Sequence, residues 1–233
     1  MTHKLVPSSN ALTWIKTSIK IGSTQYGLFL GIGLVVALTA GLVSLVPIVG
    51  PIAAGVLGFL YGVASFRFVQ KVMAREPVSF ETYFNFAFDA QLYNKFRPYL
   101  IAVLVASTIS ALNLRFGYKP IGGLVAGVVG IFNAMCAYAA FREWNEVSLN
   151  PQARLKEIFD GLLQNFLTVI FFAVLCIVFA IGCALLCVAP LFFFFLPMMI
   201  ASRYLMFSTI FDNMDADEEL KRWTLIAAEV KGT

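Results

Sequence analysis

The sequence predicts an all-α, polytopic membrane protein, and three observations support this prediction. Of the 233 residues, 60% are hydrophobic and only 13% are charged, whereas soluble domains have about 45–50% apolar and about 25% charged residues. Six apolar segments approach the roughly 20 residues that a transmembrane helix needs. The Lys and Arg residues gather on one side of these segments. A soluble globule is excluded by the shortage of polar residues, and a disordered chain by the amount of apolar surface that must be buried.

The six predicted spans form three hairpins in a single membrane domain, residues 1–233. A cytoplasmic segment, an outgoing helix, an outer turn with a proline, and a returning helix occur in this order three times. We expect repeat units at about 1–75, 76–145 and 146–214. The spans are Tyr26–Val46, Ile48–Phe66, Pro98–Leu114, Ile121–Phe141, Leu162–Val188 and Leu191–Phe211.

Charge predicts the orientation of the spans. If the N-terminal segment, the 67–97 and 142–161 loops and the C-terminal segment share one side, that side carries 15 of the 17 Lys and Arg residues when Arg203 of the sixth span is counted with it. A Lys/Arg excess marks the cytoplasmic face, so both termini are expected in the cytoplasm. The first apolar run is too long for a signal peptide. Asp215 is expected to cap a last cytoplasmic helix over residues 215–230.

Residues 150–163 are expected to form an amphipathic helix that begins at Asn150-Pro151. Such a helix would lie along the cytoplasmic leaflet, with its apolar face turned toward acyl chains or the bundle. The alternative is a free helix that docks a soluble partner through the same face. The apolar face consists of Leu155, Ile158, Phe159, Leu162 and Leu163, and opposite it lie Arg154, Lys156, Glu157 and Asp160.

Three arginines recur at the cytoplasmic ends of the returning helices: Arg67, Arg142 and Arg203. One interpretation is that they anchor the helices by snorkelling. The other is a ring of guanidinium groups that holds lipid phosphates or the acidic cytoplasmic helices. Trp14 lies in a cytoplasmic segment, where interfacial aromatic belts form. The candidates for lipid or partner contact are therefore Arg67, Arg142, Arg203, Trp14, Leu155, Ile158, Phe159 and Leu162.

Within the spans, Asn133 is the one amide far from an end. It is expected to be an interhelical hydrogen-bond partner rather than a substrate ligand. Small-xxx-small pairs let helix backbones approach closely, and we expect them to pack helices within the chain, with a homo-oligomer as the alternative. These pairs are Gly27/Gly31, Gly58/Gly62 and Gly123/Gly127.

No pattern typical of catalysis stands out, and no cofactor or metal is expected. The only histidine is His3, which removes His-based acid/base catalysis and multi-histidine metal sites. The four cysteines lie in apolar runs and are expected to pack as small hydrophobes rather than to bind Cu(I) or form disulfides. The spans are expected to lack the ionisable groups that ion-coupled carriers use.

Three local motifs carry a resemblance. They are the cytoplasmic segment with Trp14, an Ile-Val-Gly-Pro turn at Ile48–Pro51, and an Arg-Glu-Pro-Val-Ser-Phe run at residues 75–80 before a Phe-rich segment. In these, mainly over residues 1–100, the chain resembles uncharacterised bacterial polytopic inner-membrane proteins, which are similar to the membrane domain attached to some glycerophosphodiester phosphodiesterases. The resemblance implies a bacterial cytoplasmic membrane and a six-helix bundle. It implies no reaction, because the chain has no phosphodiesterase catalytic domain.

The expected function is that of a non-enzymatic scaffold, accessory subunit or membrane-organising factor. Its expected partners are membrane lipids and a protein in the membrane or at its cytoplasmic face. A net charge of +4 is too small to favour nucleic acid. The alternative is a transporter or channel for an apolar or lipid-like solute.

Overall fold

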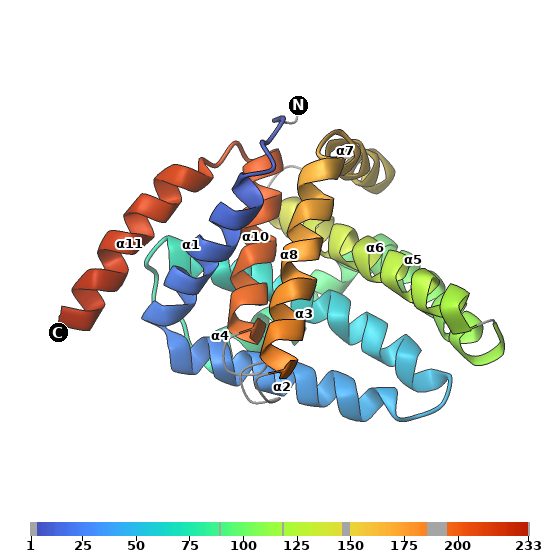
Figure 1. Cartoon of the computed structure of the whole chain (residues 1–233). Helices are drawn as coiled ribbons and strands as arrows, with labels where there is room; N and C mark the ends of the chain where they lie inside the picture. The colour runs from blue at the N-terminus through green and yellow to red at the C-terminus, as the bar shows by residue number, and fades with distance from the viewer. Residues whose placement is uncertain (1–3, 89, 118, 146–149, 186–194, 233) are drawn as a thin grey trace. The chain divides into compact units, whose positions relative to one another are not determined.

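The computed structural model is all-helical over the residues it describes, which are 4–88, 90–117, 119–145, 150–185 and 195–232. The ten helices in these ranges (Figure 1) are α1 (Asn10–Thr24), α2 (Tyr26–Ser44), α3 (Val49–Met73), α4 (Phe80–Phe88), α5 (Ala90–Phe116), α6 (Lys119–Asn145), α7 (Pro151–Gln164), α8 (Phe166–Leu185), α10 (Leu196–Phe211) and α11 (Ala216–Gly232).

Five of these helices are long and apolar enough to cross a membrane, which makes the chain a polytopic membrane protein. They match the first five predicted spans. The sixth predicted span, Leu191–Phe211, is described only from α10 onward, and α10 has 16 residues. Residues 191–194 and the predicted turn at Pro190 lie outside the described residues, so the six-span, three-repeat arrangement stays a prediction. The five candidate spans are Tyr26–Ser44, Val49–Met73, Phe96–Phe116, Ile121–Trp144 and Phe166–Cys183.

The chain divides into two compact units that interleave along the sequence. Unit 1 contains Met1–Leu34, Phe68–Phe80 and Ile158–Thr233, and unit 2 contains Val35–Arg67 and Glu81–Glu157. Four helices, α2, α3, α4 and α7, contribute residues to both units, α4 only by its first residue, Phe80. Each unit has its own helix packing.

Unit 1 is built around α1, which packs against α11, α10 and α8 (Figure 1). Apolar residues recur every three or four positions in α1, so one stripe of the helix is buried. At its centre, Trp14 is fully buried. The indole N–H of Trp14 donates to Thr209 Oγ1 at 3.0 Å, and its ring meets the ring of Phe172 edge-on with centroids 5.6 Å apart.

The segment before α1 is fixed by side chains at the start of α8. Asn165 Oδ1 accepts a hydrogen bond from the Val6 backbone N–H at 2.7 Å, and Asn165 Nδ2 donates to the Lys4 carbonyl at 3.0 Å. Thr168 Oγ1 donates to the Val6 carbonyl at 2.7 Å. These bonds satisfy backbone groups that an irregular segment otherwise leaves unpaired.

The prediction of a capped last helix is confirmed. Asp215 Oδ1 accepts hydrogen bonds from the backbone N–H groups of Asp217 and Glu218 at 2.9 and 3.2 Å, and α11 follows. Its buried side chains, Ala216, Trp223 and Ala227, lie about one helical turn or two apart. This stripe explains the packing of α11 on α1.

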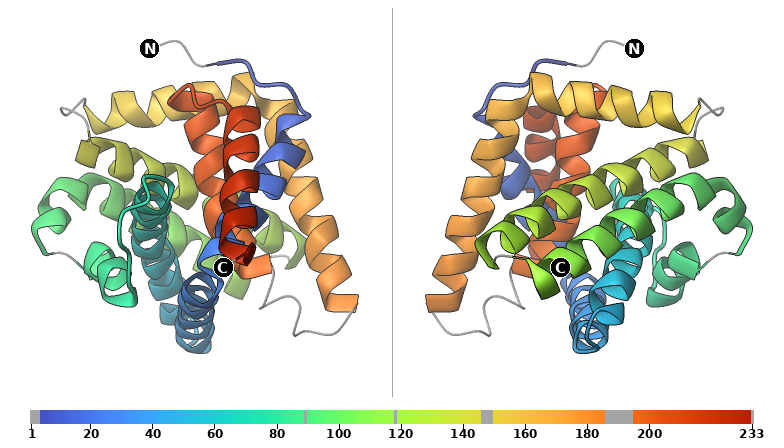
Figure 2. Two further views of the ribbon diagram at one scale, coloured as in Figure 1. Left: turned by 90° about the vertical axis from the view of Figure 1, so that its left-hand side faces the viewer. Right: turned by 90° about the vertical axis from the view of Figure 1, so that its right-hand side faces the viewer.

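Unit 2 is organised by α5 and α6, which run side by side as a hairpin (Figure 2), and by α3. Two glycines of α3 permit close approach. A Cβ built on Gly62 would lie 2.9 Å from the Cβ of Ala137 in α6, and one on Gly55 would collide with Ser107 of α5. Gly58, in contrast, faces open space, so only Gly62 of the predicted Gly58/Gly62 pair packs helices.

The Ile-Val-Gly-Pro motif contains the last residue of the turn between α2 and α3, Ile48, and the first three residues of α3. Ile48 has a φ of 64°, an unusual value for a β-branched residue. Gly50 lies so close to the carbonyl oxygen of Val43 that no Cβ would fit there. Its N–H donates to the Val46 carbonyl at 2.8 Å. The turn thus requires glycine at position 50 for a steric reason.

Candidate functional site

Charged side chains gather in unit 2 where α6 ends and α7 begins. Arg142 and Glu143 are in the last turn of α6, and Arg154 and Glu157 are in the first two turns of α7. We call these four residues, together with Arg67 of α3, the buried charge cluster. Three of its members, Arg142, Glu143 and Arg154, have at most 9% of their surface exposed.

An ion pair across the two helices is the centre of this cluster. Arg142 Nη1 lies 3.2 Å from Glu157 Oε1, with side-chain exposures of 4% and 16%. Arg154 Nη1 approaches the other oxygen of Glu157 at 4.0 Å, and the Arg154 side chain is 1% exposed. Glu157 therefore balances two buried guanidinium groups. Because removal of one partner would leave a buried charge uncompensated, the three side chains depend on one another.

Arg67 lies between two aromatic rings. Its guanidinium carbon is 4.1 Å from the ring centroid of Phe86 in α4 and 3.6 Å from the ring of Trp144 in α6. A planar guanidinium stacks well on aromatic faces, and such contacts contribute about 0.5–2 kcal/mol depending on burial. Arg67 thereby links α3, α4 and α6 within unit 2.

Tyr99 of α5 also lies beside the buried charge cluster. It is fully buried and interacts electrostatically with Glu143 and Arg154. The cluster thus collects residues of α3, α5, α6 and α7. Its three arginines and two glutamates nearly balance in charge, so the arrangement is suited to holding helices together rather than to binding a multiply charged anion.

The expected orientation of α7 is wrong in one respect. The helix does begin at Pro151, where Asn150 Oδ1 accepts the N–H of Gln152 at 3.1 Å. However, Arg154, expected on the water-facing side, is fully buried. Glu157 gives its charge a partner, and this allows the helix to turn Arg154 inward.

The apolar face of α7 is consequently only partly covered. Ile158 is fully buried and Leu155 and Leu162 are half-buried, but Phe159 is 51% exposed and Leu163 52%. In water such an exposed apolar stripe is unfavourable, whereas at a membrane surface it meets acyl chains. This exposed part of the apolar face remains available for contact with lipid or a protein partner.

Trp14 and Arg203 differ from expectation. Trp14 was expected at the membrane interface, and in the structure its burial inside unit 1 removes it from lipid and partners. Arg203 lies two turns before the end of α10 at Phe211, close enough to Cys176 of α8 to interact electrostatically. It is thus not at the helix end, and the expectation of spans without ionisable groups is wrong for this segment. The structure brings Arg67 and Arg142 into one cluster in unit 2, while Arg203 belongs to unit 1.

Asn133 lies beside Gly55 and Ser107. Its Nδ2 would lie 3.6 Å from a Cβ built on Gly55, and Ser107 Oγ lies close enough to collide with that Cβ. Among the described residues, neither Asn133 Oδ1 nor Ser107 Oγ has a hydrogen-bond partner, and both atoms are buried. The carbonyl of Asn133 therefore does not make the predicted interhelical hydrogen bond here.

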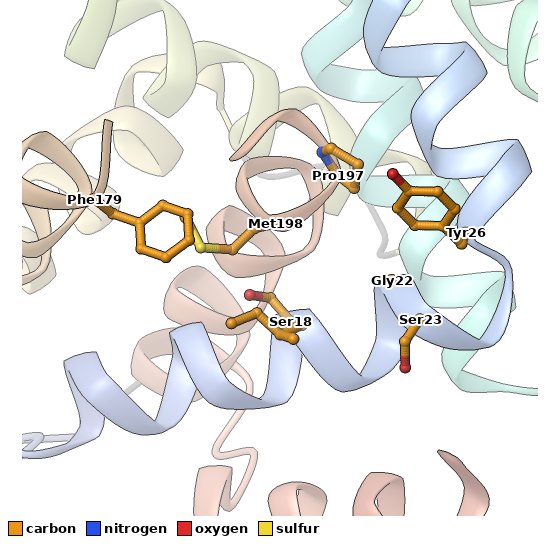
Figure 3. A pocket seen from close by; sticks show the side chains of 8 residues that line it. Ser18, Gly22, Ser23, Tyr26, Phe179, Pro197 and Met198 are labelled. Carbon is orange, nitrogen blue, oxygen red and sulfur yellow. The ribbon is translucent and has the colours of Figure 1, made fainter. Parts of the chain in front are cut away.

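Unit 1 contains an apolar pocket of about 150 Å³ between α1, α8 and α10 (Figure 3). Its inner wall is formed by buried Ser18, Gly22, Pro197 and Met198, and its rim by exposed Ile19, Ser23 and Tyr26. Phe179 of α8 lies at the same end as Met198 (Figure 3).

Sequence reasoning missed Arg154, Asn165 and Thr168 as structural residues. Arg154 looked like a solvated helix position, and nothing local distinguishes it from Lys156, which is exposed. Asn165 had a signal, because it precedes the apolar run of α8 as a polar residue that can pair with backbone groups. The cysteines described, Cys136, Cys176 and Cys183, are buried and free, and Cys187 lies outside the described residues.

Comparison of the chain with known protein families, with curated proteins and with solved structures finds no match. The function is therefore argued from the structure alone.

Proposed function

We propose that the chain is a non-enzymatic, multi-pass protein of the bacterial inner membrane that acts as a scaffold or accessory subunit. The observation that carries this proposal is the buried ion pair between Arg142 and Glu157. It joins a membrane-spanning helix, α6, to an amphipathic helix, α7, through side chains that are almost fully removed from solvent.

A buried ion pair supports positioning better than it supports stability. Desolvation of both charges offsets most of their attraction, so an apolar pair in the same place is often at least as stable. What the charged pair adds is a defined geometry, because each buried charge tolerates only an arrangement in which it is compensated. Together with the stacked Arg67, this favours a fixed cytoplasmic end over a mobile one.

The exposed surface of a fixed α7 changes character along the helix. Gln152, Ala153 and Lys156 are exposed in its first half, and Phe159 and Leu163 in its second half. The apolar second half suits the acyl region of the leaflet, which leaves the polar first half for a protein partner at the cytoplasmic face. This division of surfaces is what a membrane-bound scaffold needs.

The orientation in this proposal rests on the distribution of Lys and Arg. Reporter fusions after Phe116 should report the periplasm, and fusions after Asn150 or Gly232 the cytoplasm, because 14 of the 17 Lys and Arg residues lie in the segments assigned to the cytoplasmic side. A periplasmic reporter at Gly232 would contradict the proposed topology.

Partner capture tests the scaffold role. The full chain is purified in mild detergent from cells, and stoichiometric proteins are identified by mass spectrometry. We expect a partner with the wild type and with Glu81→Gln, an exposed residue of the same unit, but not with Glu157→Gln. Absence of any stoichiometric partner, combined with solute movement in proteoliposomes, would overturn the proposal.

One observation favours the alternative, a carrier or channel for an apolar or lipid-like solute. The pocket of unit 1 is apolar and has an exposed rim. Proteoliposomes that contain the protein should then accelerate transfer of a fluorescent lipid between leaflets. If transfer were instead driven by a proton or sodium gradient and lost in Asn133→Ala, an ion-coupled carrier would replace both proposals.

A further inference from the structure

The pocket of unit 1 has the dimensions of a subsite rather than of a complete ligand site. Drug-sized ligands occupy about 300–1,000 Å³, and this pocket has about 150 Å³. Apolar cavities of about that size stay dry and accept a benzene-sized apolar group. The pocket can therefore enclose part of a larger molecule, whose remainder must lie outside it.

The walls of the pocket select an apolar group. Phe179, Pro197 and Met198 offer rings and a thioether, and Met is well suited to adapt to flexible chains. The polar atoms nearby are mostly engaged: Ser18 Oγ donates to the Ile15 carbonyl at 2.7 Å, and Ser23 Oγ to the Lys20 carbonyl at 2.8 Å. A polar ligand would find few partners here, whereas methylene groups need none.

The rim of the pocket supplies positive charge. Lys16 precedes Ile19 by three residues and Lys20 precedes Ser23 by three, so both lysines neighbour the rim on the surface of α1. Neither lysine forms an ion pair in the part of the chain that the structure describes. Two unbalanced ammonium groups beside an apolar pocket are complementary to a molecule with an anionic head and an apolar chain.

The adjoining surface of α8 gives such a molecule access. On either side of Phe179 in sequence, Ile177, Val178 and Ile181 are each more than half exposed, and α8 is long and apolar enough to lie in a membrane. An acyl chain that lies along α8 can enter the pocket without leaving an apolar environment.

We propose that the pocket binds one acyl chain of an anionic phospholipid whose head group lies against Lys16 and Lys20. This inference rests on the membrane location in the proposed function. It does not require that the chain bind a protein partner. Each lysine should contribute about fivefold to affinity for an anionic over a zwitterionic lipid. The two lysines together therefore predict a preference of roughly 25-fold.

Native mass spectrometry of the full chain tests the proposal, with dioleoyl phosphatidylglycerol and dioleoyl phosphatidylcholine as probes. The wild type should retain one phosphatidylglycerol at detergent concentrations that remove phosphatidylcholine. Gly22→Leu should reduce retention at least tenfold, because its side chain would fill the pocket. Gly27→Leu is the matched control: a Cβ there meets nothing within 4 Å, so retention should not change.

Two further variants keep the result interpretable if Gly22→Leu does not fold. Ser23→Leu narrows the mouth from an exposed position and should reduce retention of both lipids. The double variant Lys16→Gln/Lys20→Gln should abolish the preference for phosphatidylglycerol while leaving phosphatidylcholine retention unchanged. Undiminished retention in folded Gly22→Leu or Ser23→Leu, or an unchanged preference in the double lysine variant, would overturn the proposal. If the capture experiment found no protein partner, this lipid-binding result would be unaffected.

Discussion

The two units of the molecule hold their helices together by different means. In unit 1 the contacts around α1 are neutral: the Trp14–Thr209 hydrogen bond, the ring contact with Phe172, and the amide of Asn165 on the backbone of the N-terminal segment. In unit 2 the end of the helix hairpin is held by buried charges and by a cation between two rings. Neutral contacts tolerate the loss of one partner better than buried charges do.

This difference indicates where the molecule can be altered without loss of structure. A neutral core responds to substitution mainly in proportion to the volume removed. A charge network responds to the balance of charge, even when the volume stays the same. The variants that follow separate these two responses, and they begin with the largest expected effect.

Trp14→Ala should destabilise unit 1 by about 3–5 kcal/mol, because it removes a fully buried ring and leaves a cavity. Leu12→Ala, an exposed position of the same helix, should change stability by less than about 0.5 kcal/mol. Unfolding in detergent measures both. A Trp14→Ala effect as small as that of Leu12→Ala would contradict the burial of the indole.

Glu157→Gln should destabilise unit 2 by about 3 kcal/mol, although it barely changes the volume of the side chain. The reason is that Arg142 and Arg154 lose the carboxylate between them. The exposed pair Lys71–Glu76, with side chains 36% and 52% exposed, provides the control, since Glu76→Gln should cost less than about 1 kcal/mol. Equal effects at the two pairs would show that the cluster is solvated.

Gly62→Val should cost about 1–3 kcal/mol through overpacking against Ala137 in α6. Gly58→Val lies one turn earlier on α3, where a Cβ meets nothing within 4 Å, so its cost should be small. The same unfolding measurement compares the two. A larger effect at Gly58 would mean that another molecule covers that side of α3.

The smallest expected effect concerns Asp215 and pH. Hydrogen bonds from the backbone N–H groups of Glu218 and Asp217 lower the pKa of this exposed carboxyl. The pKa is thus lower in the folded than in the unfolded chain, where it is about 3.9. The cap therefore contributes above about pH 4, and its contribution is lost as the pH falls through the folded-state pKa.

Hydrogen exchange at the first amides of α11 measures this pH dependence. Protection of these amides should fall on acidification in the wild type. In Asp215→Asn it should be independent of pH, because asparagine caps a helix without titrating. A pH dependence that persists in Asp215→Asn would assign the effect to another carboxyl group.

The sequence was sufficient for features that depend on local or additive properties. The apolar runs predicted the five described candidate spans, because crossing a membrane depends on summed hydrophobicity over about 20 residues. Asp215 and Asn150 predicted helix starts, because a cap is a contact between residues two or three apart. Both kinds of prediction need no knowledge of the tertiary fold.

Features that depend on distant partners could not be predicted in this way. Trp14 is buried by residues about 160 and 195 positions away, and no local pattern indicates these partners. The helical wheel placed Arg154 on the polar side of α7. A wheel of α7 alone cannot show that Glu157 also pairs with Arg142 of α6 and so holds both guanidinium groups. A wheel ranks faces by hydrophobicity and does not include charge compensation.

The most direct test of the scaffold proposal is the surroundings of α7 in a lipid nanodisc. Fluorescent labels at Phe159 and Ala153, both exposed positions of α7 that lie about 120° apart around the helix, are compared by quenching from lipid-borne and from water-soluble quenchers. The label at Phe159 should be quenched from the lipid and the label at Ala153 from water, and Glu157→Gln should abolish the difference. Equal quenching of both labels from water in the otherwise unchanged protein would contradict a helix that is held against the membrane surface.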